Sequence, residues 1–150
     1  MEPRPFRLKT LLAHKKRLEN LAQARLAEAK NIRDDVRTKL EDAKQQFSYA
    51  VETNEQEKAE GVAIGRLILN EQKLASLASN IKGIEKNLTE KERCVAQEQK
   101  NLLKCSQEHQ ILERLKEEQN KSYQNYLNKK EAAMLDEIAI IKHAAETDDV

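Results

Sequence analysis

The sequence predicts an all-α fold: a long two-helix antiparallel coiled-coil hairpin whose second helix is longer than the first. Two observations carry this prediction. Ala, Glu, Lys, Leu and Arg supply 82 of the 150 residues, a bias typical of long helices and coiled coils when a helical period accompanies it. Strong helix breakers are also missing from residues 6–60 and 84–150, because both prolines and all three glycines lie elsewhere.

The hairpin is expected to form a single domain over residues 1–150. We expect the first helix at about 6–54 and the second at about 64–146. The turn is placed at about 55–63, where the apolar rhythm is lost and the first glycines of the chain appear.

Each expected helix carries an apolar stripe. In the second helix one apolar residue recurs at every seventh position, as in a coiled-coil seam: Leu67, Leu74, Ile81, Leu88, Val95 and Leu102. The stripe of the first helix runs from Leu18 through Ile32 and Val36 to Val51. Its mean step of about 3.67 residues predicts a nearly straight helix.

One register places small residues of the first helix opposite large residues of the second, which fills space without aromatic side chains. The expected pairs are Ala22 with Val95, Ala29 with Leu88, and Val36 with Ile81. In this register residue 6 lies opposite residue 111, so the second helix has nothing opposite it beyond about residue 113. Residues 113–145 would extend roughly 50 Å.

This overhang keeps apolar residues along one side: Leu115, Tyr126, Met134, Ile138 and Ile141. An unpaired helix with an apolar stripe favours a binding site for another protein. Self-association in a homodimer and fraying of the helix end are the alternatives.

Composition and motifs exclude several function classes. Charged residues make up 35% of the chain but the net charge is +1, so nucleic acid and anionic lipid are not expected partners. No phosphate loop or nucleophile motif occurs, so we expect neither an enzyme nor a small-molecule substrate. Cys105 and His109 share a helix face, but no second pair completes a metal site. No metal or other cofactor is expected, and the cysteines suit a reducing cytosol.

Charge is uneven at the two ends of the chain. The first 17 residues carry six basic residues against Glu2 alone, whereas residues 136–150 carry five acids against Lys142. The basic segment and the apolar stripe are expected to bind one partner, with the charges assisting encounter. Both segments could instead serve solubility only.

Two stretches, FRLKTLLAHKKRLENLAQA (6–24) and NKKEAAMLDEIAIIKHA (128–144), resemble the terminal segments of the FliJ family of flagellar export proteins. That resemblance implies a cytoplasmic coiled coil in the bacterial type III export apparatus, peripherally associated with the inner membrane at the flagellar base and serving motility. It further implies a non-enzymatic stalk that inserts into the export ATPase ring, promotes its assembly and couples it to the export gate. Export chaperones are implied as further partners.

The resemblance also implies contact residues. The ATPase ring would contact Arg7, Lys15, Arg17, Lys129, Lys130, Met134, Ile138 and Ile141. The membrane protein of the export gate would contact Lys73, Leu77, Asn80 and Ile84.

Two other functions fit a helical hairpin. One is a holdase-type chaperone similar to prefoldin, although no alternating strand-like run links the helices here. The other is a generic coiled-coil tether, or a nucleic-acid-binding coil that uses the basic N-terminal segment.

Overall fold

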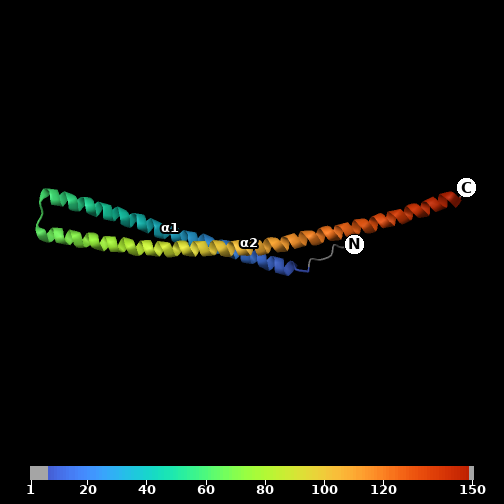
Figure 1. Ribbon diagram of the computed structural model, residues 1–150, viewed down its shortest axis with the longest axis horizontal. Helices are drawn as coiled ribbons and strands as arrows, with labels where there is room; N and C mark the ends of the chain where they lie inside the picture. Colours follow the sequence, from blue (N-terminus) through green and yellow to red (C-terminus); the bar gives the residue numbers. More distant parts are fainter. Residues whose placement is uncertain (1–6, 149–150) are drawn as a thin grey trace. The chain divides into compact units, whose positions relative to one another are not determined.

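The computed structural model describes residues 7–148, which form two helices, α1 (Lys9–Glu60) and α2 (Ile64–Asp148), in that order (Figure 1). The described residues contain no strand. Ion pairs between the two helices show that α2 packs against α1 as in a hairpin. The predicted all-α hairpin with a longer second helix is confirmed.

The turn is shorter than predicted. It comprises only residues 61–63, because α1 continues to Glu60, six residues beyond the expected end. Gly61 adopts a positive φ of 82°, a conformation that glycine allows without strain. Its N–H donates to the carbonyl oxygen of Glu57 at 3.1 Å, which caps the last turn of α1. The apolar pattern stops after residue 54, but α1 continues. The helix ends only at the first glycine, Gly61.

The chain comprises two compact units, of which the larger is Asn20–Lys104. Its buried apolar side chains are small or medium in size: Ala22, Val36, Leu40, Ala43 and Val95. Alanine at two of these positions lets the backbones approach closely, which is how two helices form a dry seam without aromatic residues. Whether residues 1–150 form a single domain stays a prediction.

The predicted register of this unit is wrong by about one heptad. Arg37 Nη2 lies 3.7 Å from Glu92 Oε1, whereas the predicted register places Arg37 about 18 Å along the helix from Glu92. Sliding α2 by seven residues moves the centre of the turn to Val62 and satisfies this ion pair. The register then brings together different seam residues: Ala29 with Val95, Val36 with Leu88, and Leu40 with Ile84.

The stripe of α1 also differs from the prediction at one position. Ile32 is 42% exposed, while the side chain of its neighbour Arg33 is only 23% exposed. The partly buried and buried positions of α1, from Leu26 to Asn54, recur with a period of seven. The first helix therefore follows the same heptad as the second, and not the longer period predicted for it.

The second unit comprises residues 7–19 and 105–148 of the described chain. Lys15 Nζ donates to Glu108 Oε2 at 2.9 Å, and Glu19 Oε2 lies 2.7 Å from His109 Nδ1. Leu112 is buried, and partly buried residues continue to Leu127. The unpartnered part of α2 thus begins later than the predicted residue 113, because the true register pairs α1 with later residues of α2.

Candidate partner-binding site

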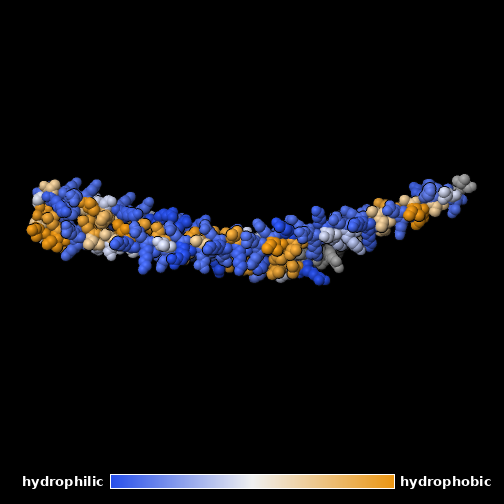
Figure 2. All heavy atoms as spheres, in the orientation of Figure 1, coloured by the Kyte–Doolittle hydropathy of each residue, from blue (hydrophilic) through white to orange (hydrophobic). Residues whose placement is uncertain are grey.

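The C-terminal part of α2 lies open to solvent. Every residue from Asn128 to Asp148 is exposed, over about 30 Å of helix at 1.5 Å per residue. Apolar side chains gather on this segment beside charged ones, at the right of Figure 2. We call residues 128–148 the overhang.

Three apolar residues of the overhang share one face. Met134, Ile138 and Ile141 follow each other at steps of four and three, which places them in one stripe on a helix. They are 56%, 57% and 68% exposed. Ile140 is equally exposed at 68%, but lies about 120° around the helix from the stripe at 100° per residue. The overhang therefore exposes to water a row of large apolar side chains that no described residue of its unit covers.

Charge changes sign along the overhang. Lys129 and Lys130 lie at its start and are exposed. Beyond them the described residues carry five acids against Lys142: Glu131, Asp136, Glu137, Glu146 and Asp148. A partner surface that fits this segment would be apolar along one line, acidic near Lys130 and basic near the end of α2.

The beginning of α1 lies beside a groove of the same unit. A hollow of about 500 Å³ is lined by Arg7, Leu8, Leu115, Glu118, Gln119 and Ser122. Leu8 and Leu115 remain 39% and 44% exposed, so the groove adds apolar surface next to the cation of Arg7. Sequence reasoning missed this groove because the predicted register placed residue 7 opposite residue 110.

The three predicted cations of α1 have different surroundings. Arg7 is exposed at the groove. Lys15 is partly buried and forms its ion pair with Glu108 across the two helices. Arg17 is exposed, and its Nε donates only to the carbonyl oxygen of Ala13 at 3.5 Å. Lys15 thus stabilises the packing of α1 on α2, whereas Arg7 and Arg17 point to solvent.

His109 lies between two carboxylates, Glu19 of α1 and Glu113 of α2. Its Nδ1 lies 2.7 Å from Glu19 Oε2, and its Nε2 lies 3.4 Å from Glu113 Oε1. No group of three or more His, Cys, Asp or Glu side chains between residues 7 and 148 is placed to hold a metal ion. The imidazole instead joins the two helices next to the ion pair of Lys15.

A polar cluster lies near the turn, in the unit Asn20–Lys104. Glu57 accepts hydrogen bonds from the guanidinium of Arg66, with Nη2 at 2.9 Å, and from the amide of Asn70. The bond from Arg66 and then that from Asn70 lower the pKa of the Glu57 carboxyl from its ordinary value. Hydrogen bonding to Glu57 in turn raises the pKa of Arg66. Asn54 is 4% exposed, and its Oδ1 has no partner among the described residues.

The chain matches one known protein family. The family model described as "Flagellar FliJ protein" matches residues 4–147, nearly the whole chain. The chain belongs to the FliJ family. Membership makes it a component of flagellar type III export, and the FliJ family is not a known family of enzymes. Searches of the curated proteins and of the solved structures gave no match.

The residues that the FliJ resemblance assigned to the gate are divided between two environments. Lys73 and Asn80 are exposed, whereas Leu77 and Ile84 are partly buried at seam positions. Lys73 also lines a small cavity of about 70 Å³ with Tyr49, Thr53, Asn54 and Asn70. The four residues therefore do not form one exposed surface.

Neither helix between residues 7 and 148 contains a stretch that is long and apolar enough to cross a bilayer.

Proposed function

We propose that the chain is a non-enzymatic stalk of the flagellar type III export apparatus. Its overhang inserts into the ring of the export ATPase, promotes assembly of that ring and couples it to the export gate. The observation that carries the proposal is the overhang itself, with Met134, Ile138 and Ile141 more than half exposed on one face. Membership of the FliJ family gives the apparatus in which the partner is sought.

The physical basis is the free energy of removing apolar side chains from water. Complete burial of one Met or Ile side chain contributes about 1.5 to 3 kcal/mol, so the stripe of three gives a substantial gain on binding. In the helical state the three side chains lie on one face at fixed spacing, so a single line of contact can bury all of them. A ring wall that is apolar opposite the stripe would bind it.

The proposed ring contacts on α2 are Lys129, Lys130, Met134, Ile138 and Ile141. On α1, Arg7 and Arg17 are proposed as direct cationic contacts because both are exposed. Lys15 contributes by holding α1 against α2 through Glu108. Charge at these positions would set orientation and the rate of encounter more than affinity.

The proposed gate contact uses Lys73 and Asn80, which are exposed. Leu77 and Ile84 would support it from the seam between the helices. The proposal places the protein in the cytoplasm, peripherally at the inner membrane below the flagellum, with export chaperones as additional partners.

The test compares two isoleucines of equal exposure. Ile141→Asp should abolish most of the stimulation that the protein gives to the purified export ATPase, because it puts a charge into the stripe. Ile140→Asp is the matched control on another side of the helix, and should retain most of the stimulation. Helix content measured by circular dichroism should be the same for both variants.

Two results would contradict the stalk proposal. One is that the unmodified protein changes neither the rate of ATP hydrolysis nor the oligomeric state of the ATPase at any ratio. The other is that Ile140→Asp and Ile141→Asp have equal effects, since the stripe would then have no special role.

A further inference from the structure

In the unit Asn20–Lys104, the side of α1 that faces away from α2 is acidic. With Leu40 at heptad position a and Val36 at position d, the outward positions b, c and f are all exposed. Between residues 24 and 56 these positions hold no Lys or Arg and seven acids: Glu28, Asp34, Asp35, Glu41, Asp42, Glu52 and Glu55. Several of them recur at intervals of seven, so they form rows along the helix.

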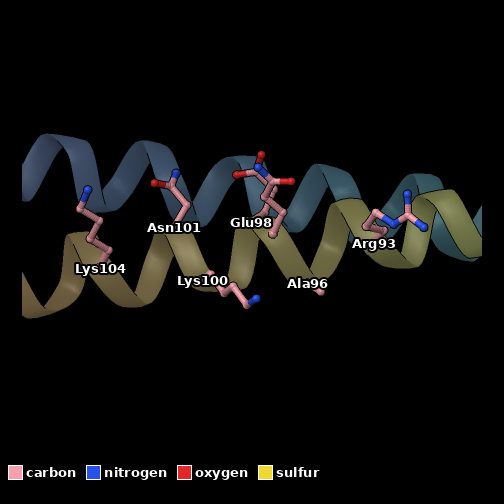
Figure 3. Close-up of a pocket in the computed structure, with 7 residues that line it drawn as sticks. Arg93, Ala96, Glu98, Lys100, Asn101 and Lys104 are labelled. Atoms are coloured by element: carbon pink, nitrogen blue, oxygen red, sulfur yellow. The ribbon is translucent and has the colours of Figure 1, made fainter.

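The outward side of α2 in the same unit is basic. With Val95 at position a, the outward positions between residues 82 and 104 hold Glu90 as their one acid. They hold five exposed bases: Lys82, Lys86, Arg93, Lys100 and Lys104. Figure 3 shows Lys100 pointing away from α1, whereas Glu98 of the seam points toward it. The two outward sides of one unit therefore carry opposite charge, which the net charge of +1 conceals.

The basic side is also hollowed. Seven residues line a hollow of about 600 Å³ on α2: Arg93, Ala96, Gln97, Glu98, Lys100, Asn101 and Lys104. Figure 3 shows six of them labelled, with Glu98 and Asn101 on the side of α1. The short side chain of Ala96 beside these cations leaves room for side chains of another molecule. The hollow therefore runs from the outward side of α2 toward the seam, and it contains one acid, Glu98, beside three cations.

The charges on both sides are largely available. Among residues 7–148, none of the five bases takes part in an ion pair within the chain. On the acidic side, Asp34 and Glu55 pair only with Arg33 and Lys58 of the same helix. Such exposed pairs on one helix contribute little and exchange readily for others.

We propose that the basic side of α2 binds the acidic side of α1 of a second copy of this chain. The two sides carry opposite charge. Their spacing also agrees, because charges on both recur every seven residues, or about 10.5 Å. A second copy fits better than a polyanion or an anionic membrane, since the acidic side of the same unit repels both. The two sides face in opposite directions, so the contact is heterologous and adds copies without closing. This association is separate from the proposed contacts of the overhang.

Exposed ion pairs are individually weak and screened by salt. The association is therefore strong at low ionic strength and at least about tenfold weaker near 0.5 M salt, where the Debye length is only a few ångströms. Sedimentation velocity over a range of protein concentrations measures this directly. The average mass should rise beyond that of a dimer at low salt.

A charge-exchange experiment tests the pairing of the two sides. One variant carries Lys86→Glu, Arg93→Glu and Lys100→Glu, and the other carries Asp35→Lys, Glu41→Lys and Asp42→Lys. Each variant alone should lose most of its self-association at low salt. The first variant makes both outward sides net negative, and the second leaves four acids against three lysines on the outward side of α1, which removes its attraction for the basic side of α2. An equal mixture of the two variants should associate. Circular dichroism shows whether a triple variant has lost helix. If one has, the experiment is repeated with a single substitution, Arg93→Glu or Asp42→Lys, in its place.

Three results would overturn the proposal: a monomeric unmodified protein at low salt, a mixture that does not associate, or self-association that persists in both variants. Vesicles containing phosphatidylserine form a further arm. Binding of the unmodified protein to them without self-association would assign the basic side to a membrane and also overturn the proposal.

Discussion

At the scale of single residues, burial separates two apolar positions of α1, Ile32 and Leu40, that the sequence pattern placed in the same stripe. Leu40 is 8% exposed, whereas Ile32 is 42% exposed. Leu40→Ala should lower the free energy of unfolding by about 2 to 3 kcal/mol, because it leaves a cavity in the seam. Ile32→Ala should change it by less than about 0.5 kcal/mol, since little burial is lost and alanine favours a helix. Urea denaturation followed by circular dichroism at 222 nm measures both free energies. Equal losses of stability would show that Ile32 packs in the seam as Leu40 does.

Glu57 gives a prediction on pH. Its pKa is lowered in the folded state by Arg66 and Asn70, so its contribution to stability is present above the pKa of the unfolded chain. That contribution is lost as the pH falls through the folded value. Glu57→Gln should therefore lower the Tm at pH 7, and the difference from the unmodified protein should shrink as the pH falls toward about 3.

Glu60→Gln, at an exposed glutamate of the same helix end, is the control and should leave the Tm almost unchanged at both pH values. A difference at Glu57 that stays constant with pH would show that the carboxylate charge is not what stabilises the turn.

Some site residues could be predicted from sequence and others could not. The spacing of Met134, Ile138 and Ile141 depends only on the geometry of one helix, so their common face was predictable. The ion pair of Lys15 with Glu108 and the groove at Arg7 depend on which residues of α2 lie opposite α1. That information is not contained in the pattern of either helix alone.

At the scale of the two helices, the register can be tested by cross-linking. In a background in which Cys94 and Cys105 are serine, cysteines at Val36 and Leu88 should cross-link within one chain. Cysteines at Val36 and Ile81 should not, because a heptad separates the two sites on α2 by about 10.5 Å. A short bismaleimide and mass analysis of the denatured product distinguish the outcomes. Efficient cross-linking of the second pair alone would support the originally predicted register.

The cause of the register error is physical. A seam that repeats every seven residues looks the same after a slide of seven, so apolar packing alone separates the two registers weakly. The seven-residue repeat itself could be read from the sequence of α2 alone, so its seam from Leu67 to Leu102 was predictable although the register was not. The turn selects the register: α1 continues to Glu60, and Glu57 then lies within reach of Arg66 and Asn70. Helix propensity beyond residue 54 therefore outweighed the loss of apolar rhythm.

At the scale of the whole molecule, the proposed function depends on the overhang, where α2 continues beyond the residues that pack against α1. Most helical stability in proteins comes from packing of the helix against other elements, and every residue of the overhang is exposed. The overhang should therefore open more often than the seam between α1 and α2, and a bound partner should suppress this opening.

Amide hydrogen exchange of residues 128–148, with and without the purified flagellar export ATPase, tests this claim most directly. We expect fast exchange in the free protein and slow exchange in the complex, with the seam around Val95 protected in both. If residues 128–148 exchange equally fast with and without the ATPase, while binding is demonstrated in the same sample, the overhang is not the stalk that enters the ring.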